Sequence, residues 1–112
     1  EPTRRRMFVW LNQKAGRATT GPVSIGRIAR CDVVVADFTI SRDHAWVTRD
    51  ATTKTWSLVD RGSRNGTKVG DRWLTAGEQV QLKSGDMVSL GRVSFQFIEP
   101  TDFYARLMRE GD

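Results

Sequence analysis

Apolar residues in this sequence recur at every second position within segments only a few residues long. The segments Val23–Ile25, Ala45–Thr48 and Thr55–Val59 follow this alternation for the most part. Because side chains point alternately to the two faces of an extended strand, this spacing predicts strands with one buried face. Turn-forming residues separate the segments at short intervals, which is typical of an all-β sandwich or barrel. We therefore expect an all-β fold.

About nine or ten short strands can be marked directly on the sequence. They fall at residues 7–11, 21–26, 32–36, 45–48, 55–59, 67–69, 72–74, 78–82, 87–90 and 93–98. Residues 50–54, 70–71, 83–86 and 91–92 are predicted to be the turns between neighbouring strands. Such turns are short and rich in Gly, Asp and Ser, as hairpins require.

Residues 100–112 differ from the rest of the chain. Thr101 and Asp102 can cap a helix, and apolar side chains then follow on one helical face at Phe103, Tyr104, Leu107 and Met108. We expect a short amphipathic helix, or a connection to a missing domain. The chain begins with Glu, so we expect it to be either processed or, as we favour, a domain excised from a longer protein.

The chain has 112 residues, which is room for a single domain. It contains one Cys and one His, too few for an internal disulfide or a zinc site. We expect no metal and no cofactor. No apolar run approaches membrane-spanning length, so a membrane partner is not expected. The free thiol favours a reducing, cytoplasmic setting.

The net charge of +5 rests mainly on arginine, with fourteen Arg against four Lys. Arginine presents a planar fork that grips phosphate or carboxylate through two hydrogen bonds. This bias favours a partner that carries phosphate. Composition alone leaves open whether that partner is a nucleic acid, a membrane or a phosphoprotein.

Two segments between the predicted strands, residues 39–45 and 60–67, together with Gly26–Arg27 at the end of another strand, hold most of the candidate binding groups. They contribute Arg27, Arg42, Arg61 and Arg64, the hydroxyls of Ser41, Ser63 and Thr67, and the amide of Asn65. Sandwiches gather their loops at the two ends of the sheets. If these loops meet, they form a cationic pocket suited to a phosphate dianion.

The order of these motifs resembles the forkhead-associated (FHA) domain family. The matching residues are Gly26–Arg27, Ser41–His44, Asn65–Thr67 with Val69–Gly70, and later Leu82–Asp86 and Leu90–Gly91. The resemblance covers roughly residues 6–99. It implies a two-sheet β-sandwich. Together with the strands and the helix predicted above, it leads us to expect a two-sheet antiparallel β-sandwich of about ten or eleven strands with a short C-terminal helix. It also implies a module that binds phosphothreonine peptides and docks its parent protein onto partners phosphorylated by a Ser/Thr kinase.

The resemblance also implies roles for individual residues. Arg27 would pair with the phosphate, Ser41 would donate its hydroxyl to it, and Asn65 would bind the peptide backbone. Arg42 occupies a position where the family often has a phosphate contact, although pairing with Asp43 or Asp37 is an alternative. Structural support would come from Gly26, His44 and Gly66, with His44 bracing the Ser41 loop.

Arg64 departs from the family, which often has a hydroxyl residue just before the motif asparagine. A guanidinium here has three possible uses. It can join the phosphate contacts, read an acidic residue of the peptide, or stay solvated. We favour the acidic residue, because a third cation crowded onto one phosphate costs repulsion in the free protein.

Other function classes fit less well. Ser41 and His44 with an aspartate suggest a catalytic triad, but the sequence shows neither a nucleophile elbow nor an oxyanion hole. We therefore do not expect the protein to be an enzyme. A nucleic-acid backbone would use the same arginines and is the main alternative. A non-binding scaffold of the same fold is the other. The retained set of Arg27, Ser41 and Asn65 favours binding.

Overall fold

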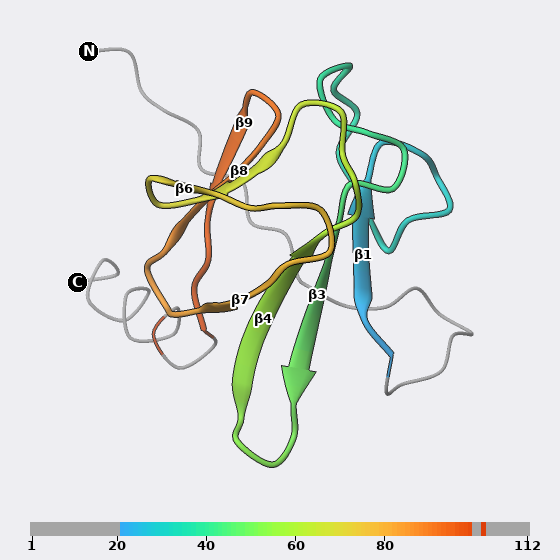
Figure 1. Ribbon diagram of the computed structural model, residues 1–112. Helices are drawn as coiled ribbons and strands as arrows, with labels where there is room; N and C mark the ends of the chain where they lie inside the picture. Colours follow the sequence, from blue (N-terminus) through green and yellow to red (C-terminus); the bar gives the residue numbers. More distant parts are fainter. Residues whose placement is uncertain (1–20, 100–101, 103–112) are drawn as a thin grey trace, which may run out of the picture.

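The computed structural model describes residues 21–99 and 102, and in this part of the chain nine strands form two facing sheets (Figure 1). The expected all-β sandwich is therefore confirmed. The predicted strand at residues 7–11 lies outside the described residues. So does the predicted helix or connection at residues 100–112, apart from Asp102.

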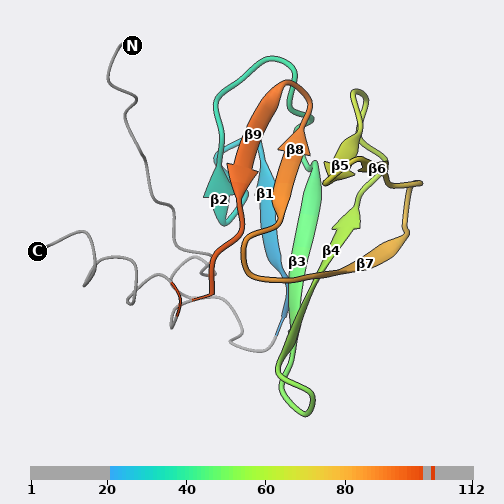
Figure 2. The ribbon, with the colours of Figure 1, turned by 90° about the vertical axis from the view of Figure 1, so that its left-hand side faces the viewer.

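The strands follow the predicted order closely. They are β1 (Val23–Gly26), β2 (Val33–Val34), β3 (Ala45–Asp50), β4 (Thr55–Asp60), β5 (Thr67–Val69), β6 (Arg72–Trp73), β7 (Gln79–Leu82), β8 (Met87–Leu90) and β9 (Val93–Gln96). The first sheet has the order β2-β1-β3-β4-β7, and the second has the order β6-β5-β8-β9. Figure 2 shows β8 and β9 of the second sheet in front of β1 and β3 of the first.

The β3–β4 hairpin forms the centre of the first sheet. Its antiparallel ladder runs from the Ala45–Asp60 pair to the Asp50–Thr55 pair. Ala45 and Leu58 point inward and are almost fully buried, as the alternating pattern predicts. At the turn, Oδ1 of Asp50 accepts the backbone N–H of Thr52 at 2.8 Å.

The pairing of β1 with β2 departs from the expected antiparallel arrangement. Ile25 lies beside Val33 in a parallel register. The intervening loop turns back on itself, because the Asp32 carboxylate accepts the backbone N–H of Ser24 at 2.9 Å and the Asp32 N–H donates to Oγ of Ser24 at 2.9 Å. This polar pair returns the chain to the side of β1, so β2 then runs in the same direction.

The core lies between the two sheets and is built from side chains of both. Its buried members are Val23, Ile25, Val33, Ile40, Ala45, Val47, Leu58, Leu74, Leu82, Val88, Leu90 and Phe97. Trp56 packs edge-on against Phe97, with ring centroids 5.7 Å apart. Ile40 belongs to the loop before β3, so the core anchors that loop as well as the strands.

The strand registers bring three loops to one end of the sandwich. Ile25 pairs with Ala45, and Ala45 pairs with Asp60, so the end of β1, the start of β3 and the end of β4 are neighbours. The β3–β4 turn lies at the opposite end (Figure 1). In the described part of the chain, no helix has the length and apolar character needed to cross a membrane.

Candidate functional site

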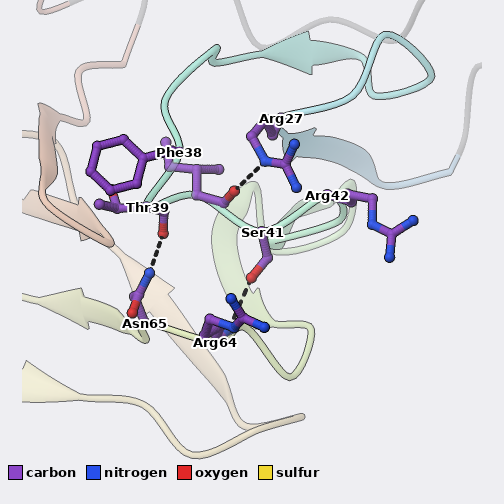
Figure 3. Close-up of a pocket in the computed structure, with 8 residues that line it drawn as sticks. Arg27, Phe38, Thr39, Ser41, Arg42, Arg64 and Asn65 are labelled. Carbon is purple, nitrogen blue, oxygen red and sulfur yellow. Dashed lines mark hydrogen bonds between the residues drawn. The ribbon is translucent and has the colours of Figure 1, made fainter.

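A pocket of about 240 Å³ opens at the end of the sandwich where these loops meet (Figure 3). Its lining residues are Arg27, Phe38, Thr39, Ile40, Ser41, Arg42, Arg64 and Asn65. The structure therefore brings together all five residues that the sequence nominated for phosphopeptide binding. Three of the lining side chains are arginines and none is a carboxylate.

Arg27 is fixed in the pocket wall by the neighbouring loop. Its backbone N–H donates to the carbonyl of Ser41 at 3.1 Å, and its Nε donates to the carbonyl of Ile40 at 3.0 Å. The guanidinium is thus held through Nε, and its two terminal nitrogens remain available to donate hydrogen bonds to a ligand. Figure 3 shows these nitrogens on the side of Ser41 and Arg42.

Gly26 allows this close approach. A Cβ at residue 26 would overlap the carbonyl oxygen of Arg42 and lie 2.7 Å from Sγ of Cys31. Only glycine therefore lets β1 end against the loop. The same packing buries Cys31, and this burial raises the pKa of its thiol. Cys31 donates its S–H to the carbonyl of Arg42 at 3.1 Å.

The Ser41 hydroxyl is oriented by the second loop. Its Oγ accepts the backbone N–H of Arg64 at 2.9 Å. A hydroxyl has one hydrogen to donate and two lone pairs to accept with. Since this contact uses a lone pair, the hydroxyl hydrogen remains available to an acceptor in the pocket.

His44 braces both loops from beneath the pocket. Its side chain is fully buried, with 0% of its surface exposed. Nδ1 accepts the backbone N–H of Ser41 at 3.0 Å, and Nε2 lies 2.9 Å from the carbonyl of Gly66. An acceptor at Nδ1 leaves the proton on Nε2, so the ring donates to Gly66. His44 therefore holds the Ser41 loop and the Asn65–Gly66 turn at a fixed separation.

Asn65 crosses from the second loop to the first. Its Nδ2 donates to the carbonyl of Thr39 at 2.8 Å. The side-chain amide has a second N–H and a carbonyl oxygen beyond this contact, which suits recognition of an extended peptide backbone. Gly66, which follows it, has a φ of 89° and lies so close to Trp73 that a Cβ would be 2.8 Å from Cζ3. Glycine is therefore required at this turn.

Asp60 organises the second loop from its base. Its Oδ1 accepts the hydroxyls of Ser63 and Thr67, each at 2.6 Å. Its Oδ2 accepts the backbone N–H of Gly62 at 3.0 Å. Burial on its own raises the pKa of Asp60, but these hydrogen bonds outweigh burial and bring the pKa below its ordinary value. The sequence did not reveal this role.

Asp37 ties the first loop to the β8–β9 turn. Its Oδ1 accepts Nε and Nη2 of Arg92 at 3.0 and 2.8 Å, and its Oδ2 accepts the N–H and the hydroxyl of Thr39. Hydrogen bonds from Arg92 and then from Thr39 lower the pKa of Asp37 from 3.8 to about 2. Thr39 and its neighbour Phe38, which line the pocket, are thus fixed to the second sheet.

Two aspartates that flank the pocket-lining residues 38–42 in sequence pair with arginines outside the pocket. Asp37 pairs with Arg92, and Asp43 lies 3.5 Å from Nε of Arg61. Within residues 21–99, neither Arg42 nor Arg64 forms an ion pair. The alternative pairing considered for Arg42 is therefore not seen.

Three of the candidate donors lie away from the pocket. Arg61 stacks on the ring of Trp46 at 3.8 Å, and Trp46 in turn donates its Nε1–H to Asp43 at 3.0 Å. The Ser63 and Thr67 hydroxyls both point to Asp60. These side chains shape the loops that carry the site, and their partners are in the protein.

The hydrogen bonds around Ser41 differ from those of a catalytic triad. His44 contacts the backbone N–H of Ser41 and not its hydroxyl. The hydroxyl oxygen of Ser41 instead accepts the backbone N–H of Arg64. His44 therefore does not act as a base on the hydroxyl. Among the residues for which coordinates are described, no group of three or more His, Cys, Asp or Glu side chains is arranged to hold a metal ion.

Comparison with known sequences agrees with this geometry. The pattern that defines the FHA domain matches residues 23–91, more than half of the chain. The chain belongs to the FHA domain family. Because the match spans the strands from β1 to β8, it includes every residue that lines the pocket.

This FHA domain has relatives that are much longer proteins. It is 33% identical to protein phosphatase 2C 70 of Arabidopsis thaliana over 85 residues, covering 69% of this chain and 15% of the phosphatase. It is 32% identical to fork head protein homolog 2 of Schizosaccharomyces pombe over 89 residues, covering 76% of this chain and 14% of that protein. The chain therefore spans about one seventh of the length of these relatives.

Solved FHA structures share the fold. Mycobacterium tuberculosis EmbR, in complex with a low-affinity phosphopeptide, aligns with a TM-score of 0.62 at 26% identity, over 75% of this chain and 22% of that one. A domain studied for phosphothreonine-dependent FHA interactions aligns with a TM-score of 0.63 at 28% identity, over 77% and 88% of the two chains.

Proposed function

We propose that this FHA domain binds phosphothreonine peptides and docks its parent protein onto partners phosphorylated by Ser/Thr kinases. The observation that carries the proposal is the pocket itself. Three arginines and Ser41, whose hydroxyl hydrogen is free to donate, line one opening to which no carboxylate contributes. A phosphate dianion offers the charge and the three acceptor oxygens that such a set of donors can satisfy.

Each predicted binding residue has a definite place in this proposal. Arg27 and Ser41 contact the phosphate, and Arg42 adds charge at its open side. Asn65 holds the peptide backbone beside the phosphorylated residue. Arg64, whose side chain is exposed, reaches an acidic residue elsewhere in the peptide. A relative solved with a phosphopeptide, and another studied for phosphothreonine-dependent interactions, support a phosphopeptide as the ligand.

A phosphomonoester suits the pocket better than a nucleic-acid backbone. The donors surround a single opening of about 240 Å³, where one terminal phosphate can meet several of them at once. A phosphodiester chain is held instead by cations spread along its path. We propose accordingly that the chain acts by binding, without catalysis. We also propose that it works in the cytoplasm, which contains Ser/Thr kinases and is reducing enough to keep the thiol of Cys31 free.

A calorimetric titration tests the function. One peptide sequence is prepared with phosphothreonine, phosphoserine, unmodified threonine or glutamate at the central position, and single-stranded and duplex DNA serve as controls. We expect binding to require the phosphate, and to weaken between about pH 7 and 5 as the phosphate loses its second charge. The proposed function would be wrong if the glutamate peptide bound as tightly as the phosphothreonine peptide. It would also be wrong if DNA bound more tightly than that peptide, with a steep salt dependence.

A further inference from the structure

Phe38 is the most exposed large apolar side chain in the described part of the chain. It is 78% exposed, yet it lines the pocket. A single exposed apolar residue is ordinary on a protein surface. Phe38 differs because it occupies the rim of the binding site, and because a network of charged groups holds it there.

That network fixes the ring from one side. The guanidinium of Arg92 lies 4.6 Å from the ring centroid of Phe38. Asp37 holds the same guanidinium at 2.8 and 3.0 Å, and the backbone N–H of Arg92 donates to Oγ1 of Thr39 at 3.1 Å. A guanidinium that is itself held in place therefore covers one part of the ring and restrains it before any ligand arrives.

The ring also lies on a distinct side of the pocket. Figure 3 shows Phe38 beside Thr39 and above Asn65, across from the outward-reaching side chain of Arg42. The charge of Arg92 is neutralised by Asp37, so this side lacks the net positive charge found around Arg27 and Arg42. Because Phe38 lines the same pocket as Asn65 and the arginines, side chains that flank the phosphothreonine come within reach of Phe38 when a peptide is held through its phosphate and backbone.

We infer that Phe38 forms a second subsite, which selects an aliphatic side chain close to the phosphothreonine in the bound peptide. This inference rests on the proposed phosphopeptide function and adds a sequence preference to it. An aliphatic side chain against the open part of the ring removes apolar surface from water on both partners. Arg92 and Asp37 are positioning residues for this subsite.

An oriented library of threonine-phosphorylated peptides tests the inference, with each flanking position randomised in turn. The parent domain is expected to enrich Leu, Ile, Val or Met at one flanking position. The Phe38→Ala variant should lose that enrichment while it still prefers phosphorylated to unphosphorylated peptides. Because Phe38 is largely exposed, its removal leaves the core intact, and a thermal melt checks that the variant is folded.

The best library peptide then gives the size of the effect. Its Kd is compared with that of the same peptide carrying Ala at the selected position. We expect the parent to lose about five- to tenfold in affinity, and Phe38→Ala to show no difference between the two peptides. Arg92→Ala, which frees the ring, should reduce the difference. Met87→Ala is the matched control, because Met87 is 47% exposed but does not line the pocket.

Three outcomes overturn the inference. One is a parent domain that binds phosphothreonine peptides with no aliphatic preference. Another is a Phe38→Ala variant that keeps the preference. The third is a parent domain that does not distinguish phosphorylated from unphosphorylated peptides. This last result also removes the proposed function, whereas the first two leave it standing.

Discussion

Ser41 shows how single residues in this site combine structure with binding. Its backbone N–H donates to His44, its carbonyl accepts the backbone N–H of Arg27, and its hydroxyl oxygen accepts that of Arg64. One hydroxyl hydrogen is left for a ligand. The geometry of three neighbouring residues therefore depends on a residue that also contacts the proposed phosphate.

His44 is expected to act through stability. Replacement by Ala deletes two hydrogen bonds of a fully buried side chain and opens a cavity beneath both loops. We expect His44→Ala to lower the free energy of unfolding by about 2–3 kcal/mol, measured by denaturant titration. Phosphopeptide affinity should fall because the Ser41 loop loosens. Unchanged stability together with abolished binding would point to a direct contact with the ligand.

Arg64 is expected to set a preference within the peptide. Its side chain is exposed at the pocket edge, while its backbone N–H holds Ser41. Arg64→Thr keeps that backbone contact and removes only the cation. We expect the variant to lose a preference for Asp or Glu near the phosphothreonine, worth about 0.2–1 kcal/mol in paired calorimetric titrations. An equal loss for every phosphopeptide would assign Arg64 to the phosphate instead.

At the scale of elements, the turn of the β3–β4 hairpin places a residue other than glycine in the left-handed backbone region that favours glycine. Lys54 closes the turn with a φ of 59°, the only positive φ at a non-glycine position among the described residues. We expect Lys54→Gly to raise the free energy of unfolding by about 0.5–1 kcal/mol, because glycine adopts this region without strain. Thr52→Gly, in the same turn without a positive φ, is the control and should not stabilise. A less stable Lys54→Gly variant would contradict this account.

The elements also show which features follow from sequence. The alternating apolar positions of Ala45–Thr48 and Thr55–Val59 predict β3 and β4 because burial on one face suffices to define them. The parallel pairing of β2 was not predictable, since it depends on the Ser24–Asp32 contact within the preceding loop. Local patterns therefore predict where the strands lie, whereas a side-chain contact sets the direction in which the short strand β2 pairs with β1.

The site likewise contains residues that the sequence predicts and residues that only the structure reveals. Arg27, Ser41 and Asn65 were predictable because each belongs to a motif, and the strand registers bring their loops together. Phe38 was missed as a pocket residue, although an aromatic side chain between two predicted strands was a usable signal. The ion pair of Asp37 with Arg92 joins residues 55 positions apart, and no local pattern marks such a contact.

At the scale of the whole molecule, two carboxylates couple stability to pH. Asp37 has a pKa of about 2 in the folded protein against 3.8 ordinarily, and the pKa of Asp60 is also lowered. A lowered folded-state pKa means that the charged form stabilises the fold. This contribution is complete above the unfolded pKa, and it is lost as pH falls through the folded one.

We therefore expect the free energy of unfolding to fall as pH drops from about 4 to 2, followed by tryptophan fluorescence in urea. Asp37→Asn removes one of the two titrating groups. The variant should be less stable at neutral pH and should show a shallower decline in acid. An identical acid decline in parent and variant would show that the Asp37–Arg92 pair does not stabilise the fold.

The full chain carries a net charge of +5, so general attraction between the chain and any anionic peptide must be separated from binding in the pocket. Arg27→Ala and Arg49→Ala remove the same charge at different places. Arg49 lies on β3 against Trp56, away from the pocket, whereas Arg27 lines it. A difference between the two variants therefore reports on the pocket alone.

The most direct measurement is the calorimetric affinity of one threonine-phosphorylated peptide for the parent and for these two variants. We predict that Arg27→Ala loses about 1.5–3 kcal/mol of binding free energy, the range for a hydrogen bond between charged groups, while Arg49→Ala binds nearly as the parent does. Equal affinity of Arg27→Ala and the parent would contradict the account, because the phosphate would then bind elsewhere.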